Sequence, residues 1–141
     1  MIENNFFKGK KILVAGSSGF VGTHLTKKLS GLGANVLGSY FNHPPKERIL
    51  NVKYIKADFT SYDDCLNATK NIDYVFMGAA YTSGAAVMEK TPLVHLTPNV
   101  VMNSQILAAA YENNISKFCF ISSNTVTVSY THLTLPTICS V

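Results

Sequence analysis

Short runs of apolar residues alternate along this chain with longer segments of mixed polarity. Five of the runs are continuously apolar rather than alternating between apolar and polar residues. Such runs are typical of parallel strands that are buried on both faces. We therefore expect strands at residues 11–15, 36–39, 54–57, 74–78 and 118–121.

The segments between these runs carry helix signals. Apolar residues recur three and four positions apart in two of them, as on the buried face of a helix. Ser61 and Asp64 have the spacing of a capping box, which opens a helix. We expect helices from Phe20 to the glycines at 31 and 33, from Ser61 to about Thr69, and from Asn99 to Tyr111.

Strand and helix signals alternate, and parallel strands require crossover connections, which are usually helices. The sequence therefore predicts an α/β fold, a doubly wound parallel sheet. We expect its five strands in the order 3-2-1-4-5.

Composition limits the class of protein. The chain has 141 residues, of which 47% are hydrophobic and 14% charged. This is enough apolar material for the core of one domain and excludes a disordered chain. The net charge is +4, and the lysines and arginines are scattered, so we expect no nucleic-acid partner.

The cysteines and the apolar runs indicate the cellular compartment of the protein. Cys65, Cys119 and Cys139 lie too far apart in the sequence for a recognisable disulfide framework or zinc motif. No apolar run approaches the roughly 20 residues needed to cross a bilayer. The N-terminal segment is too polar for a signal peptide. We expect a cytoplasmic protein with no membrane partner and no metal.

Residues 128–141 do not follow the pattern of the rest of the chain. They contain no turn, cap or helix signal that would pack on the last strand, and they resemble a translated sequencing adapter. We expect residues 1–127 to be a truncated domain and residues 128–141 a non-native tail. The alternative is a genuine edge strand that ends at Pro136.

The strongest chemical signal is a glycine triplet between the first strand and the first helix. Gly16 permits a tight turn, Gly19 lets the backbone approach a pyrophosphate, and Gly22 lets the helix press on the strand. The start of the helix then offers free N–H groups to the phosphates. We assign six residues of this loop to cofactor binding: Gly16, Ser18, Gly19, Phe20, Val21 and Gly22.

The GxxGxxG spacing resembles the extended short-chain dehydrogenase/reductase (NAD-dependent epimerase/dehydratase) family, over residues 8–127. The resemblance implies a Rossmann domain and a nicotinamide cofactor. It also implies that Asp58, with Phe59 beside it, contacts the adenine. Ala79 and Ala80 would lie along the nicotinamide ribose.

Within this family the chain most resembles the GDP-L-fucose synthase subgroup. The resemblance rests on the segment Ala79–Gly84 followed by Pro92, Asn99 and Ser104. It implies a nucleotide-sugar substrate. The family also implies a homodimer formed through the helix at residues 99–111.

The segment Phe120–Val126 resembles the family's SSxxVY motif. This resemblance implies that Ser123 is catalytic and hydrogen-bonds the sugar oxygen, with Ser122 as an alternative. The family's Tyr-x-x-x-Lys pair is absent from the chain, and Thr127 stands where the family usually has tyrosine. We therefore expect the chain to bind a dinucleotide but not to catalyse a reaction.

Cofactor choice depends on the end of the second strand, where a carboxylate would bind the ribose of NAD. Residues 38–43 contain none, and Lys46 and Arg48 follow. We expect NADP to be slightly preferred over NAD, although the two cations also suit a solvated loop.

Other polar residues have simpler interpretations. Asn99 is either an amide that orients the long helix, as in the family, or the N-cap of that helix. His24 and His95 have no partner at metal-ligand spacing. Two classes of function remain open: part of an enzyme acting on nucleotide sugars, or a non-catalytic NAD(P)-binding sensor or scaffold.

Overall fold

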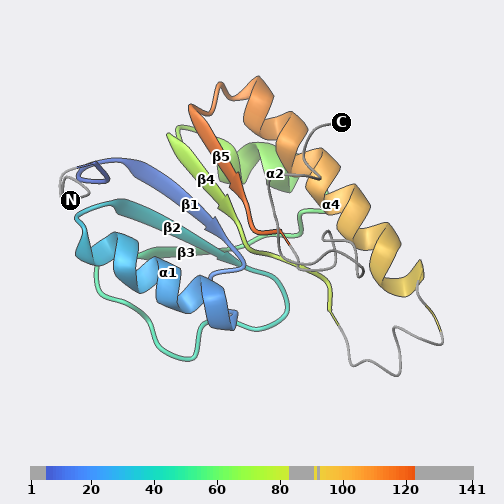
Figure 1. Ribbon diagram of the computed structural model, residues 1–141, viewed down its shortest axis with the longest axis horizontal. Coiled ribbons are helices and arrows are strands. Elements are labelled where there is room, and N and C mark those ends of the chain that lie inside the picture. Colours follow the sequence, from blue (N-terminus) through green and yellow to red (C-terminus); the bar gives the residue numbers. More distant parts are fainter. Residues whose placement is uncertain (1–5, 83–90, 92, 123–141) are drawn as a thin grey trace, which may run out of the picture.

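The computed structural model describes residues 6–82, 91 and 93–122. Strands and helices alternate along most of this part of the chain (Figure 1). The elements are β1 (Lys11–Ala15), α1 (Phe20–Gly31), β2 (Asn35–Tyr40), β3 (Lys53–Lys56), α2 (Tyr62–Thr69), β4 (Tyr74–Met77), α4 (Leu93–Glu112) and β5 (Lys117–Phe120). Each strand lies within one or two residues of its predicted bounds.

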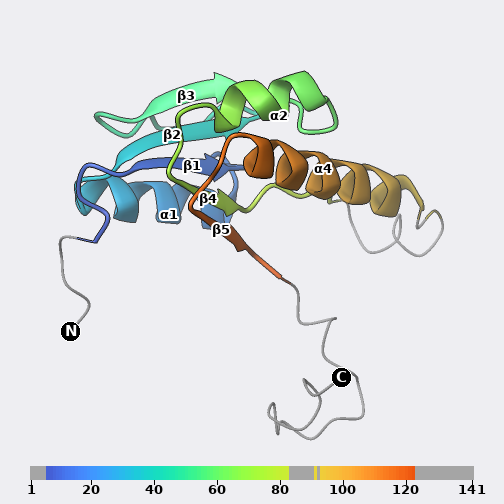
Figure 2. The same cartoon turned by 90° about the horizontal axis from the view of Figure 1, so that it is seen from above.

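The strands form one sheet in the order β3-β2-β1-β4-β5 (Figure 2). Every neighbouring pair is parallel. The predicted fold class and strand order are therefore confirmed. The order reverses between β1 and β4, and in open α/β sheets a ligand site lies at the carboxyl end of the strands at such a point.

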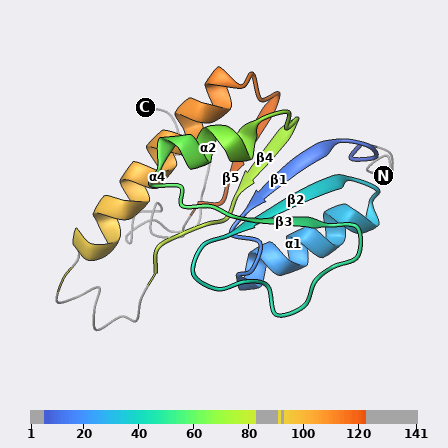
Figure 3. The same cartoon turned by 180° about the vertical axis from the view of Figure 1, so that it is seen from behind.

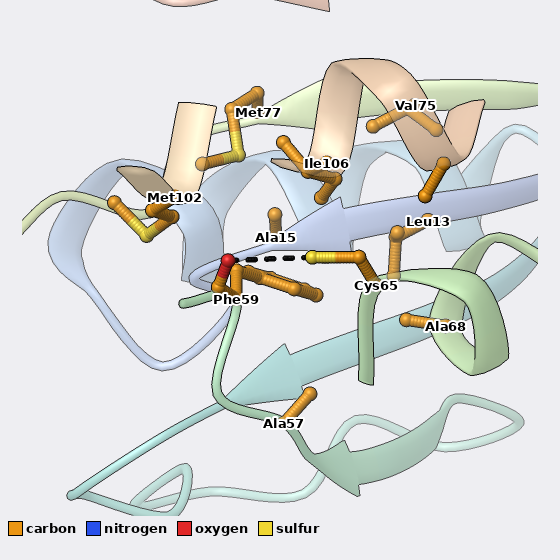
Figure 4. Close-up of a cluster of buried hydrophobic side chains, with 11 residues drawn as sticks. Leu13, Ala15, Ala57, Phe59, Cys65, Ala68, Val75, Met77, Met102 and Ile106 are labelled. Atoms are coloured by element: carbon orange, nitrogen blue, oxygen red, sulfur yellow. Dashed lines mark hydrogen bonds between the residues drawn. The ribbon is translucent and has the colours of Figure 1, made fainter. Parts of the chain in front are cut away.

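Alternate residues of β1 serve two hydrophobic cores. Leu13 and Ala15 belong to the core beneath α2 and α4 (Figure 4). Ile12 and Val14 belong to the core on the opposite face, with Leu29 of α1. The side chains of these four β1 residues are completely buried. This explains the continuously apolar run, because a central strand of a doubly wound sheet has no solvent face.

The two helices on one face of the sheet lie side by side (Figure 3). The Tyr62 hydroxyl of α2 donates a hydrogen bond of 2.7 Å to Oε2 of Glu112 at the end of α4. That bond is the main cause that raises the pKa of Tyr62 above its usual value. Asn113 makes a second link, since its Nδ2 donates to Thr69 Oγ1 and to the Leu66 carbonyl.

The predicted start of the long helix at Asn99 is wrong, because α4 begins at Leu93. Pro98 lies inside the helix. It is the sixth residue of α4, so it removes one backbone N–H that would otherwise bond to the carbonyl of Val94. Leu93 and Leu96 are largely exposed, so the first turns lack the buried apolar positions that marked the rest of the helix.

The capping box predicted at Ser61 is also not formed, although Ser61 does directly precede α2. The Ser61 side chain makes no capping bond. Oδ2 of Asp64 instead accepts a hydrogen bond of 2.8 Å from the backbone N–H of Asp58. The acid of the expected pair is therefore used to fix the loop between β3 and α2.

Candidate dinucleotide-binding site

A cavity of about 740 Å³ lies at the carboxyl end of the strands. Its volume is in the range of small-molecule and cofactor sites. The loops after β1, β2, β3 and β4 and one side of α4 form its walls. The lining residues are Gly16, Ser18, Gly19, Ser39–His43, Ala57–Thr60, Gly78–Thr82, Val94, Pro98 and Met102.

Gly16 is required by the backbone. Its φ is +76°, in the left-handed region that glycine tolerates and other residues rarely adopt. A Cβ there would also lie 2.8 Å from the N and Cα atoms of Ala79. The first glycine therefore permits both the turn after β1 and the close approach of the loop after β4.

Gly22 is required by packing between the helix and the loop. A Cβ at Gly22 would collide with the carbonyl oxygen of Gly16 and lie 2.8 Å from Cα of Ser17. Gly22 is buried within α1. The third glycine thus lets the helix start directly against the turn.

Gly19 has a different reason to be glycine. Its φ is −75°, and the nearest atom to an added Cβ would be the Gly16 carbonyl oxygen at 3.4 Å. The protein itself would thus accept a side chain here. Gly19 lines the cavity, so a side chain would occupy space that a phosphate could use. This fits a backbone that a pyrophosphate approaches closely.

The first turn of α1 offers unpaired backbone N–H groups. Gly19 is the N-cap, and there is no acidic residue in the first turn. The helix dipole there favours an anion. Phe20 and Val21 are 83% and 52% exposed. Neither they nor Gly22 belong to the cavity lining, so their role in cofactor binding stays a prediction.

Two serines that the sequence analysis did not single out hold this loop on β2. Both the backbone N–H and the hydroxyl of Ser17 donate to the Ser39 carbonyl, at 2.8 and 2.9 Å. A Cβ at Gly38 would lie 2.6 Å from Ser17 Oγ. A glycine within a predicted strand is the signal that could have revealed this close approach.

Asp58 and Phe59 lie at the end of β3 and both line the cavity. Oδ1 of Asp58 accepts hydrogen bonds from the Thr60 N–H and hydroxyl, at 2.9 and 2.7 Å. The Phe59 carbonyl accepts a bond of 3.3 Å from the buried Cys65 thiol. Burial, with smaller effects from Asp64 and Asp58, raises the pKa of Cys65 to about 12. This thiol is therefore neutral and not a nucleophile.

Ala79 and Ala80 line the cavity after β4. The Gly78 N–H donates to the Ala15 carbonyl at 3.1 Å and so continues the sheet toward this loop. The structure thus brings Gly16, Ser18 and Gly19 together with the predicted residues that follow β3 and β4. The proposed catalytic residue, Ser123, lies outside the described residues.

Asn99 is not an N-cap, because it lies in the second turn of α4. Its side-chain amide binds the backbone of Tyr81 and the carbonyl of His95. No pattern in the sequence predicts that Asn99 pairs with Tyr81.

The end of β2 carries no carboxylate where it lines the cavity, in agreement with the sequence. Lys46 and Arg48 are exposed and do not belong to the lining. Asp58 is the only acidic residue among the lining residues. The geometry thus leaves the choice between NAD and NADP open.

No group of three potential metal ligands occurs among the described residues. Within the same part of the chain, no helix is both long and apolar enough to span a bilayer.

A switch-point cavity faced by a glycine-rich turn and a helix N-terminus defines a dinucleotide-binding domain. The sequence model of the NAD dependent epimerase/dehydratase family matches residues 12–136. The chain belongs to this family.

Known proteins agree with this membership. The chain is 27% identical over 115 residues to GDP-mannose 3,5-epimerase 1 of Oryza sativa, covering 80% of this chain and 30% of that protein. An epimerase from Methanothermobacter thermautotrophicus has a similar structure, with a TM-score of 0.77 and 28% identity over 88% of this chain and 38% of that one. MoeE5, solved with UDP-glucuronic acid and NAD, gives a TM-score of 0.70 and 26% identity over 80% and 36% of the two chains. The chain thus spans less than half the length of each.

Proposed function

We propose that this chain is the NAD(P)-binding part of an enzyme that epimerises, reduces or dehydrates a nucleotide sugar. The observation that carries the proposal is the glycine loop. The fold requires glycine at positions 16 and 22, because a Cβ there would collide with backbone atoms. It does not require glycine at position 19, where the missing side chain leaves space at the cavity wall.

A bound nicotinamide nucleotide would supply the hydride acceptor and donor. The loop at Gly16–Gly19 and the first turn of α1 would hold its phosphates. Within the described part of the chain the hydrogen bonds to the Asp58 carboxylate are made at Oδ1, so Oδ2 suits the adenine amino group. Ser123 would donate a hydrogen bond to the sugar oxygen in the complete site.

Two of the relatives support the proposed substrate class. One acts on GDP-mannose by its name, and another was solved with UDP-glucuronic acid. Both are nucleotide sugars. Within this class we favour a GDP-L-fucose synthase-like activity, which rests on the pattern from Ala79 to Ser104.

For the cofactor we favour NADP slightly over NAD. The absence of a carboxylate at the end of β2 leaves room for a 2′-phosphate. The family description and the MoeE5 complex support NAD, so both nucleotides belong in the test.

The chain contains no Tyr-x-x-x-Lys sequence, so we do not expect it to convert substrate by itself. We propose that residues 1–127 are native and that residues 128–141 are a non-native tail.

The outer side of α4 favours a homodimer. Five large apolar side chains recur along it at helical spacing and are each more than half exposed: Leu93, Leu96, Val100, Leu107 and Tyr111. Exposed apolar side chains repeated along one helix in this way are typical of a protein–protein interface.

Calorimetric titration of the 141-residue chain with NADP and with NAD tests the proposal. We expect binding heat with at least one of them, and its loss in Gly19→Leu, whose side chain would fill the cavity wall. Gly31→Ala is the matched control, because nothing lies within 4 Å of an added Cβ there. No heat with either nucleotide, or unchanged affinity in Gly19→Leu, would refute the glycine-loop site.

The second candidate, a non-catalytic sensor or scaffold, is favoured by the absence of the Tyr-x-x-x-Lys pair. Sequencing overlapping DNA across the codons for residues 120–141 separates the two. A reading frame that continues from Val126 to a Tyr-x-x-x-Lys supports the enzyme. A native stop near Thr127 supports the sensor.

A further inference from the structure

Three hydrogen bonds join the glycine-rich turn to the last part of β2, and one residue of β2 accepts all three. The backbone N–H and the hydroxyl of Ser17 donate to the Ser39 carbonyl, at 2.8 and 2.9 Å. The backbone N–H of Gly16 donates to Oγ of Ser39 at 3.4 Å. Both serines are only 1% exposed, so water does not readily replace a bond that is lost here.

Only one of the three bonds depends on the side chain of residue 17. The backbone bond extends the parallel pairing of β1 with β2 beyond Val14 and Gly38, and any residue except proline could make it. The second bond requires a hydroxyl at this position. Gly38 leaves room for it, because a Cβ there would lie 2.6 Å from Oγ of Ser17. The sequence thus places a donor on the turn and a space for it on β2.

The two segments that Ser17 joins form different walls of the cavity. Gly16 and Ser18 line it on the side of the turn, and the residues from Ser39 to His43 line it on the side of β2. The turn is the proposed phosphate site, and in dinucleotide-binding domains the end of the second strand faces the ribose 2′ position. The position of the ribose wall relative to the phosphate wall therefore depends on how firmly Ser17 holds Ser39.

We propose that Ser17 is a positioning residue, whose hydroxyl fixes the end of β2 relative to the phosphate-binding turn and thereby sharpens the choice between NADP and NAD. This inference rests on the proposed function. The two nucleotides carry the same pyrophosphate and differ only at one ribose 2′ position, so contacts at the end of β2 separate them. A wall held in one place discriminates between a hydroxyl and a phosphate, whereas a wall that shifts accommodates both. Ser17 acts through Ser39, since its own side chain is buried and does not line the cavity.

The test compares Ser17→Ala with the original 141-residue chain by calorimetric titration with NADP and with NAD. The substitution removes one oxygen atom and adds no volume, so the protein should still fold. We expect the ratio of the two dissociation constants to move toward one by about two- to tenfold, the range that corresponds to the loss of one neutral hydrogen bond. A second measurement needs no ligand: hydrogen exchange at the Gly16 amide, which bonds to Ser39, should accelerate by a similar factor.

Thr23→Val is the matched control. The Thr23 hydroxyl of α1 donates to the Ser17 carbonyl at 3.2 Å. Replacing it by a methyl group removes a hydrogen bond from the same turn but leaves the bonds to Ser39 in place. This change should weaken both nucleotides by the same factor, if at all, and leave the ratio and the Gly16 exchange as in the original chain. A merely structural role for Ser17 would give the same result as this control.

The outcomes separate this inference from the proposed function. If the original chain binds neither nucleotide, the proposed function fails and the positioning role fails with it. If the original chain binds both equally well, or if Ser17→Ala keeps the original ratio or moves it away from one, only the positioning role is overturned. Unchanged Gly16 exchange in Ser17→Ala, or an equal change of ratio in Thr23→Val, would also overturn it. A ratio closer to one together with faster Gly16 exchange, both confined to Ser17→Ala, supports it.

Discussion

The loops after β1 and β4 lie at the same edge of the sheet, touch at Gly16 and Ala79, and face one cavity. The loop after β1 is shaped by close backbone contacts: the Gly19 N–H donates to the Gly16 carbonyl at 3.1 Å, Gly22 packs on the same oxygen, and Ser17 binds the Ser39 carbonyl of β2. The loop after β4 is held at Tyr81 by an amide 18 residues away. Two parts of one site thus owe their shape to contacts of different kinds, glycine packing against backbone atoms in the first and side-chain hydrogen bonds in the second.

This difference determines what mutation should do. In the loop after β1 the constraint is steric and involves backbone atoms, which cannot move without moving the strand or helix. In the loop after β4 the constraint is a set of hydrogen bonds, whose loss is worth about 1 kcal/mol each. Substitutions in the loop after β1 should therefore lower the stability of the fold. Substitutions that remove the hydrogen bonds of the loop after β4 should mainly weaken nucleotide binding.

The largest effect is expected for Gly22→Val. Two added methyl groups and a Cβ would overlap the Gly16 carbonyl and the Ser17 backbone. We expect unfolding to become easier by about 3 kcal/mol or more, measured as the urea midpoint by circular dichroism. Gly31→Ala should be neutral or slightly stabilising. A Gly22→Val protein with the original midpoint would show that the helix start does not press on the turn.

Gly16→Ala should have the next largest effect and reach both loops. The positive φ costs about 1–2 kcal/mol for alanine, and its Cβ would displace Ala79. A double-mutant cycle with Asn99→Ala measures the connection between the two anchors of the loop after β4. We expect the two effects on nucleotide affinity to be non-additive by at least about 0.5 kcal/mol. Strict additivity would mean that the loops are independent.

The same contrast explains what the sequence could reveal. The run Lys11–Ala15 predicted a buried strand, and the glycine triplet predicted the turn, because each pattern is complete within a few consecutive residues. The bond between Asn99 and Tyr81 joins segments whose proximity arises only after the sheet and α4 have assembled. The start of α4 was misplaced for a related reason, since its first turns expose the leucines that would mark a buried face.

The loop after β3 lies between these two cases and should show the smallest effect. The Cys65 thiol, one turn into α2, donates to the Phe59 carbonyl in this loop. Its pKa is raised to about 12 in the folded protein, from 9.0 for an unperturbed thiol. The unfolded chain thus loses this proton at lower pH than the folded one, so the contribution is intact below pH 9 and declines between pH 9 and 12.

Raising the pH from 8 to 10 should therefore lower the free energy of unfolding through Cys65 by about 1 kcal/mol. Urea titrations at both pH values measure the change in the free energy of unfolding. The Cys65→Ala protein should lack the part of this change that comes from the thiol. Cys119→Ala removes an exposed thiol and should keep the full change. An equal change in Cys65→Ala and the original chain would mean that the thiol is not protected in the fold. The bond from α2 would then contribute nothing to ordering the loop after β3, whose other hydrogen bonds include the Asp58–Asp64 contact and those from Thr60 to Asp58.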